Sequence, residues 1–359
     1  MPRKRVQWWV TDTKRSLTRL LRRDGAGRLT SENLATAMEN AQTTRAVYRI
    51  APAPRRQDPE NGYDTSLKLL QSLHRHDGPF SVELWSDEGS IELYISTEAT
   101  VSRTLEQRLD VFFPDATITE IEPVFPHVSA DEYVAGARLA LRNDYCLQIA
   151  NPLGASGLRT DPYNEVMSAM TGTGGARAVV QVVFRPAPEE WWRRWYLPLT
   201  AGESLRSEPP LLPRQVTCAD LVDGSELPVM DERTRDTVRG QQTESAFLTE
   251  IRVCGIGASK RATERVVKAV GNVFEERYDD PKMDQGLVEL GVPTRRLRSW
   301  FDGLVERRLE EYRPRLGRYQ YEPCLLTVPE LAAVAHVPSR KERDEFALTS
   351  PGFEWTDER

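Results

Sequence analysis

The chain has 359 residues and a formal net charge of −6, and 39% of its residues are hydrophobic. This composition is typical of a soluble globular protein of about two domains, and it excludes a fibrous or wholly disordered chain. No apolar run reaches the roughly 20 residues that a membrane helix needs, and the basic N-terminus lacks the apolar core of a secretion signal.

The charge is unevenly distributed along the chain. Residues 1–24 carry a net charge of +6, so the remaining residues carry −12. Trp8 and Trp9 lie among these basic residues. Residues 1–44 are therefore interpreted as a basic amphipathic arm and linker that can contact an anionic membrane or a nucleic acid. A basic terminus that frays or docks on the body is the alternative interpretation.

The first folded unit is expected over residues 45–125. Its apolar periodicity predicts strands at 46–53, 80–85, 91–95 and 116–122, with helices at 64–74 and 97–113. The second and third strands form a hairpin whose turn is Asp87-Glu88-Gly89. The resulting order βαββαβ is that of a split-βαβ, ferredoxin-like domain.

A second unit of similar order is expected over residues 126–290. Strand patterns occur at 136–142, 145–150, 178–184 and 246–255, and helix patterns begin at Asp161-Pro162 and at Ser259. A proline-rich insertion spans about 186–244. The predicted fold class is therefore α+β, with two tandem ferredoxin-like two-layer sandwiches and a long insertion in the second. The two sheets are expected to pack together or to share an edge.

The residues that usually carry enzyme chemistry are sparse. None of the seven lysines is followed by Ser or Thr, as a phosphate-binding Walker A loop requires. The carboxylate pairs are adjacent in loops, and no His or Cys has a partner at metal-ligand spacing. We therefore expect no catalytic residue, no metal ligand and no cofactor. The four cysteines are expected to be buried free thiols: Cys146, Cys218, Cys254 and Cys324.

Two clusters are candidate interaction surfaces. The first, a candidate membrane or partner surface, interleaves aromatic and basic residues: Trp191, Trp192, Arg193, Arg194, Trp195 and Tyr196. An aromatic lid over a sheet edge is the alternative, and base stacking is a third possibility.

The second cluster is a candidate nucleic-acid contact because arginines recur beside Trp300 and Phe301. Glu306, Glu310 and Glu311 lie among them, so a solvated, salt-bridged helix is the alternative. Its arginines are Arg295, Arg296, Arg298, Arg307, Arg308, Arg315 and Arg318. The nearby His336 is expected to be structural.

Several strings occur in an order that resembles a known family. They are LLQSLH (69–74), FFPDA (112–116), DPYN (161–164), VVQVVFRPA (179–187), the pair Trp191-Trp192, IRV (251–253) and LTVPELAAVAHVPS (326–339). The series resembles the region that precedes the motor domain in conjugative type IV secretion and coupling ATPases of the FtsK/HerA group. The scarcity of lysine beside an acidic body indicates a salt-adapted source such as a haloarchaeon.

That resemblance implies a function. The given sequence ends at Arg359, where the motor of that family would start. We therefore expect a module without the ATPase domain, either as the N-terminal portion of a longer protein or as a stand-alone homologue that acts beside a separate ATPase. Residues 291–359 then read as an Arg-rich helix and a hinge segment leading to a missing motor. The expected role is that of a non-catalytic assembly or adaptor module of a DNA-transfer machine. It is expected in the cytoplasm, either free or peripheral at the inner face of the membrane. Its expected partners are an ATPase motor in cis or in trans, secretion-machine proteins, an anionic membrane surface, DNA or a second copy of the chain.

The alternative hypothesis is a nucleic-acid-binding module of a virus or plasmid. It would use the basic arm and the Arg-rich helix, and its affinity would fall steeply with salt.

Overall fold

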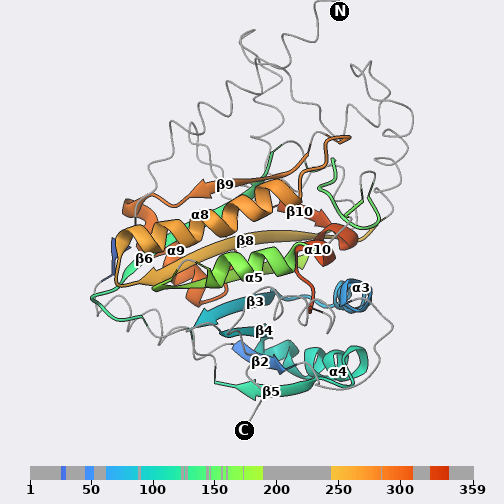
Figure 1. The fold of residues 1–359 in the computed structure, drawn as a ribbon. Coiled ribbons are helices and arrows are strands. Elements are labelled where there is room, and N and C mark those ends of the chain that lie inside the picture. Colours follow the sequence, from blue (N-terminus) through green and yellow to red (C-terminus); the bar gives the residue numbers. More distant parts are fainter. Residues whose placement is uncertain are drawn as a thin grey trace, which may run out of the picture.

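The structure, a computed structural model, describes residues 26–29, 45–51, 62–87, 90–122, 125, 128–142, 145, 147–154, 157–158, 161–172, 174–188, 244–283, 285–309 and 324–338. Within these residues the chain is mixed α/β and is built on one large antiparallel sheet of ten strands (Figure 1). The strands are β1 (Gly27–Arg28), β2 (Arg45–Ala51), β3 (Phe80–Asp87), β4 (Ser90–Glu98), β5 (Thr117–Ile121), β6 (Tyr133–Leu141), β7 (Ala176–Pro186), β8 (Ala246–Gly257), β9 (Leu287–Gly291) and β10 (Cys324–Thr327).

The helices cover this sheet unequally. One face carries α3 (Gly62–Leu73), α4 (Ser102–Phe112), α5 (Tyr163–Thr171), α8 (Lys260–Arg277) and α10 (Val328–Val334), whose apolar residues share one core. The other face carries α9 (Leu297–Val305), whose apolar residues belong to a second core. Two short 3₁₀ turns, η1 (Ala99–Val101) and η3 (Thr294–Arg296), precede α4 and α9.

Most of the predicted elements are present. The β3–β4 hairpin pairs Asp87 with Ser90, as the turn residues indicated. Helix α8 begins where Ser259 was expected to cap it, and the Ser259 hydroxyl accepts from the Ala262 N–H. At the start of α5, the Asp161 carboxylate accepts the Tyr163 N–H at 2.8 Å. Local signals that satisfy the unpaired N–H groups at a helix start therefore marked two boundaries correctly.

One predicted strand is wrong. Among residues 145–150, those that the structure describes are not in a strand. Leu147 and Ile149 are buried, but side chains hold their backbone: Gln285 donates to the Leu147 carbonyl and Glu330 accepts from the Ile149 N–H. The apolar alternation in this stretch reflects burial by distant residues rather than pairing in the sheet.

The strand order joins the two predicted units. It runs β1-β6-β8-β7-β3-β4-β2-β5, with β9 also paired to β6 and β10 also paired to β8. The units meet at β3 and β7, which pair antiparallel from Phe80–Phe184 to Trp85–Val179. Of the two expected alternatives, the shared edge is therefore the one observed. Pro186 faces Phe247 across β7 and β8, so the long insertion leaves and re-enters the sheet at one point.

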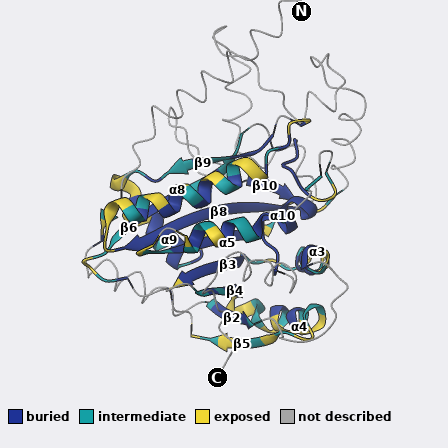
Figure 2. Ribbon diagram, in the orientation of Figure 1, coloured by how far each residue is buried: buried dark blue, intermediate teal, exposed yellow. Residues whose placement is uncertain are grey.

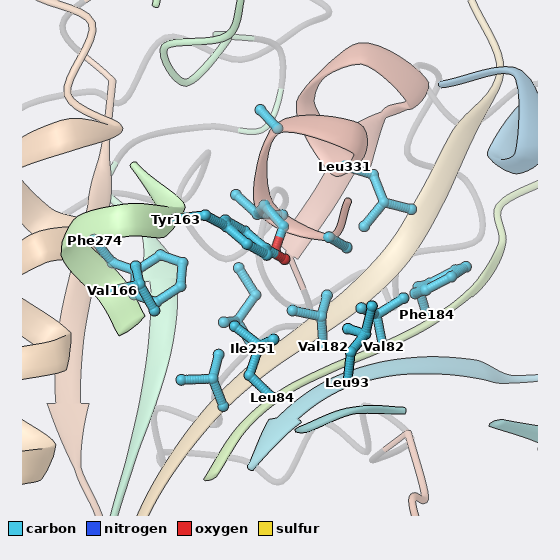
Figure 3. Close-up of a cluster of buried hydrophobic side chains, with 14 of the residues drawn as sticks. Val82, Leu84, Leu93, Tyr163, Val166, Val182, Phe184, Ile251, Phe274 and Leu331 are labelled. Carbon is cyan, nitrogen blue, oxygen red and sulfur yellow. The ribbon is translucent and has the colours of Figure 1, made fainter. Parts of the chain in front are cut away.

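The larger core belongs to both units. Val82, Leu84 and Leu93 from the first unit lie beside Val182 and Ile251 from the second (Figure 3). Tyr163, Val166, Phe274 and Leu331 close over them from the helices (Figure 3). The central strands are buried along most of their length (Figure 2), and every residue of β8 is buried. None of the helices in the described ranges is long and apolar enough to span a membrane.

Candidate functional site

Helix α9 lies across the face of the sheet opposite the other helices. Its apolar residues recur at helical spacing and are all buried against the sheet: Leu297, Trp300, Phe301, Leu304 and Val305. The contact with the sheet is close at Gly136 of β6, where an added Cβ would lie 2.4 Å from the Trp300 ring. Trp300 and Phe301 were expected to interleave with arginines for base stacking, and their burial rules out that use.

Beneath the C-terminal end of α9, polar residues form a row across the sheet. The strand register places Glu83 opposite Gln181 and Gln181 opposite Arg252. All three are buried. They are also hydrogen-bonded in series, because Arg252 Nη1 donates to Gln181 Oε1 at 2.9 Å and Gln181 Nε2 donates to Glu83 Oε1 at 3.2 Å. These bonds satisfy most of the polar groups that burial removes from water, and Arg252 Nε is the atom of this row left without a hydrogen-bond partner.

Two residues of this row, Arg252 and Gln181, donate hydrogen bonds to the backbone at the end of α9. Arg252 donates to the carbonyl oxygens of Gly303, at 2.8 Å, and of Arg308. Gln181 donates to the carbonyl of Leu304 at 2.9 Å. The last carbonyls of a helix have no partner within the helix and carry partial negative charge, so guanidinium and amide donors stabilise them.

A buried ion pair completes the arrangement. Arg307 follows α9 with a positive φ of 53° and donates through Nε to Glu83 Oε1 at 2.7 Å and through Nη2 to Glu83 Oε2 at 3.2 Å. Both side chains are fully buried. Glu83 also accepts from Ser81 and from the Trp85 indole, so its carboxylate is well satisfied. We call Arg45, Glu83, Gln181, Arg252 and Arg307 the clasp.

The clasp carries more positive than negative charge. Arg45 donates to the carbonyl oxygens of Pro79 and Arg307. Burial, followed by the neighbouring charge of Arg307, lowers the pKa of Arg45 to about 10. The guanidinium is still protonated at neutral pH, and the carbonyl oxygens of Pro79 and Arg307 offset part of its charge. The clasp therefore joins β2 and β3 of the first unit to β7 and β8 of the second through α9.

The residues predicted to contact nucleic acid fall into three groups: exposed, buried, and outside the described residues. Arg295, Arg296 and Arg298 are exposed on the outward side of η3 and α9, and Arg308 is also exposed. The prediction that Arg307 contacts nucleic acid is wrong, because its side chain is fully buried against Glu83 and does not reach the surface. The alternative prediction of a solvated helix is also wrong for α9, because its apolar side is buried in the second core. Arg315 and Arg318 lie outside the described residues.

The other sequence-predicted surface also lies outside them. Trp8, Trp9 and the basic arm are not among the described residues, and neither is the aromatic cluster. That cluster comprised Trp191, Trp192, Arg193, Arg194, Trp195 and Tyr196. Of the cysteines, Cys254 and Cys324 are buried free thiols as predicted, and burial raises the pKa of both. Within the described residues no cluster of His, Cys, Asp or Glu could hold a metal ion.

The segment 324–338 forms a second site, and it packs against both units. β10 pairs with the first residues of β8, and the buried helix α10 packs on α3. Three tyrosine hydroxyls donate to backbone carbonyls of α10: Tyr63 to Pro329, Tyr163 to Val334 and Tyr278 to Ala333. Tyr63 comes from the first unit and the other two from the second. We call residues 324–338 the docked segment.

Two ionisable groups fix the ends of α10. At its start, Glu330 and Thr327 form a capping box, and Glu330 also accepts the Ile149 N–H. Glu330 is fully buried, which raises its pKa to about 7. After its end, His336 lies 2.6 Å from Asp161 Oδ2 through Nε2 and against the Tyr163 ring. His336 is thus buried and held by neighbours, in line with the structural role predicted for it.

Together, the fold and these two sites define a single-sheet α/β protein in which α9 and the docked segment contact several strands and helices that are far apart in the chain. The chain belongs to the family described as Domain of unknown function (DUF8128), whose model matches residues 23–345. No curated protein matches the chain.

Proposed function

We propose that this chain is a non-catalytic assembly module of a conjugative, type IV secretion-like DNA-transfer machine. In this proposal it lies at the cytoplasmic face of the membrane and organises an ATPase motor supplied in cis or in trans. The observation that carries the proposal is the docked segment. Its sequence resembles the step before the motor in conjugative ATPases, and it contacts α3, β8 and α5, so a motor attached there would be coupled to both units.

The proposal includes a finer description of the fold, namely two ferredoxin-like units over residues 45–125 and 126–290. The strand orders support it. The first unit runs β5-β2-β4-β3 and the second runs β9-β6-β8-β7, so both follow the same order of fourth, first, third and second strand.

Equivalent residues of the two units support an internal duplication. Arg49 pairs with Glu92 in the first unit, and Arg138 pairs with Glu250 in the second. Two residues further along the same strand, Tyr94 donates to Glu92 and Arg252 donates to Glu250. The register relates these positions by a pseudo-twofold axis between β3 and β7.

A non-catalytic role is supported by how the buried ionisable groups are used. Glu83 is paired with Arg307, Glu330 accepts from three donors, and His336 is hydrogen-bonded to Asp161. Each of these groups holds chain segments together. Satisfied buried polar networks rigidify a fold, and these bonds join residues that are far apart in the chain.

Genetics in the native host tests the proposal. Deleting the gene should abolish transfer of a conjugative element without changing growth, and a tagged chain should co-purify with a P-loop ATPase unless that motor is part of the same chain. The double variant Y163F/Y278F lacks two hydrogen bonds to α10, which loosens the docked segment. Expressed in the deletion strain, this variant should restore transfer only partly. Tyr48→Phe is the matched control, because the Tyr48 hydroxyl donates to Ser102 within the first unit. Normal transfer in the deletion strain would refute the proposed function.

A further inference from the structure

The outward side of η3 and α9 is a basic surface. Arg295, Arg296 and Arg298 are exposed there. Strand β1 lies alongside, because an added Cβ on Gly27 would be 3.1 Å from Thr294 and Leu297. The neighbouring Arg28 does not belong to this surface, because its guanidinium lies 4.5 Å from the centroid of the Tyr133 ring, which packs against the larger core on the opposite face of the sheet.

Little negative charge offsets this surface. Glu306 is paired with Arg308 at 3.3 Å, and Asp302 interacts with Arg298 and Arg308. Within the described ranges, no ion pair or side-chain hydrogen bond engages the guanidinium groups of Arg295 or Arg296. Like charges this close repel one another, so the cluster lowers stability unless an anion neutralises it.

The surface is held rigidly. The five apolar residues of α9 are buried on the sheet, and the clasp holds its C-terminal carbonyls. A fixed backbone reduces the entropy lost when the arginine side chains bind a ligand. Guanidinium groups match phosphate oxygens in geometry and bind them through two parallel hydrogen bonds.

We infer that Arg295, Arg296 and Arg298 bind the phosphodiester backbone of DNA without reading its sequence. The inference rests on the proposed function and names the nucleic acid as a direct partner of the module. DNA is favoured over a lipid surface because membrane-bound helices insert apolar side chains, whereas those of α9 are all buried in the protein. The large hydrophobic residues exposed within the described ranges, Val111 and Leu153, lie on α4 and after Asn151.

Fluorescence anisotropy with labelled DNA of random sequence, as a duplex and as a single strand of equal length, tests this inference on the full chain. The triple variant R295Q/R296Q/R298Q should bind more weakly than the wild type at every salt concentration. For duplex DNA its plot of log affinity against log salt should be shallower by about 2.7, since each phosphate contact contributes roughly 0.9. Its melting temperature should change little, because the one described interaction that is lost joins the exposed Arg298 to Asp302.

The matched control removes the same charge from the opposite face of the sheet. Arg261, Arg265 and Lys268 are exposed on α8, and R261Q/R265Q/K268Q should keep the wild-type salt dependence. An equal loss in both triple variants, or no change in the α9 variant, would overturn the assignment. So would binding to phosphatidylglycerol vesicles that depends on the α9 arginines in the absence of DNA binding. If transfer requires the gene but the α9 variant binds DNA normally, this inference fails while the proposed function stands.

Discussion

Glu83 is the one carboxylate of the clasp. It accepts from Arg307, Gln181, Ser81 and Trp85, and it lies in the strand where the two units join. A buried ion pair adds little over a well-packed apolar pair, but removing one partner leaves an uncompensated charge in a medium of low dielectric constant.

We therefore expect Glu83→Ala to lower the free energy of unfolding by about 3–5 kcal/mol in urea titrations. Arg308→Ala is the control, because it breaks an ion pair at the surface with Glu306, and such pairs contribute at most about 1 kcal/mol. Equal losses in the two variants would contradict the structural role given to the clasp.

Glu330 makes stability depend on pH. Its pKa is about 7 in the folded protein because of burial, against an ordinary value of 4.5. The folded state therefore retains a proton that the unfolded state has lost between about pH 4.5 and pH 7, so the contribution of this group to stability falls as pH rises through that window and is constant above it. At 1.36 kcal/mol per pKa unit the total is about 3 kcal/mol.

Replacing Glu330 by Gln removes this titration. The difference in unfolding free energy between E330Q and the wild type should shift in favour of the variant from pH 5 to pH 7 and stay level up to pH 8. Taking the difference cancels the groups whose titration is the same in both proteins. A difference that is independent of pH would show that Glu330 is ionised throughout this range.

At the scale of elements, α9 is held by close packing as well as by the clasp. Gly136→Ala places a methyl group where the Trp300 ring lies, and such overpacking costs about 1–3 kcal/mol. Gly303→Ala puts the same group in α9 itself, where the nearest atoms are 3.8 Å away. Removing a helical glycine there should stabilise the protein by about 0.5–1 kcal/mol.

Thermal unfolding of the two alanine variants therefore separates packing from helix propensity. The expected shifts are downward for Gly136→Ala and upward for Gly303→Ala. Two shifts of the same sign would show that α9 does not lie against β6 as described.

At the scale of the whole molecule, one sheet and one shared core should make the two units unfold together. Leu84→Ala tests this, because Leu84 faces Val180 across the junction and lies in the larger core. It should cost about 2–5 kcal/mol. Native-state hydrogen exchange should show the same loss for amides of β4 and of β8. A loss confined to β4 would indicate two independent domains.

Much of the fold could be predicted because local signals agree with it. Alternating residues in β3 and β4 and the Ser259 cap of α8 act over a few residues, so periodicity and capping chemistry reveal them. Strand β9 and helix α10 were missed as elements. Each is short, and every residue of α10 is buried, so α10 has no exposed polar face that would reveal a helical stripe.

The clasp could not be predicted, and the physical reason is distance along the chain. Arg307 lies 224 residues from Glu83, within an Arg- and Glu-rich stretch that is typical of a solvated helix. Nothing local distinguishes it from the exposed Arg295 and Arg298.

The sequence by itself determined the order of most strands and helices, the absence of a Walker A loop and the basic character of residues 295–308. These follow from composition and short-range spacing. Only the tertiary structure decided that the two units share one sheet, which arginines are buried, and that residues 324–338 pack against both units. Those outcomes depend on strand register and on contacts between residues far apart in the chain, which no local pattern encodes.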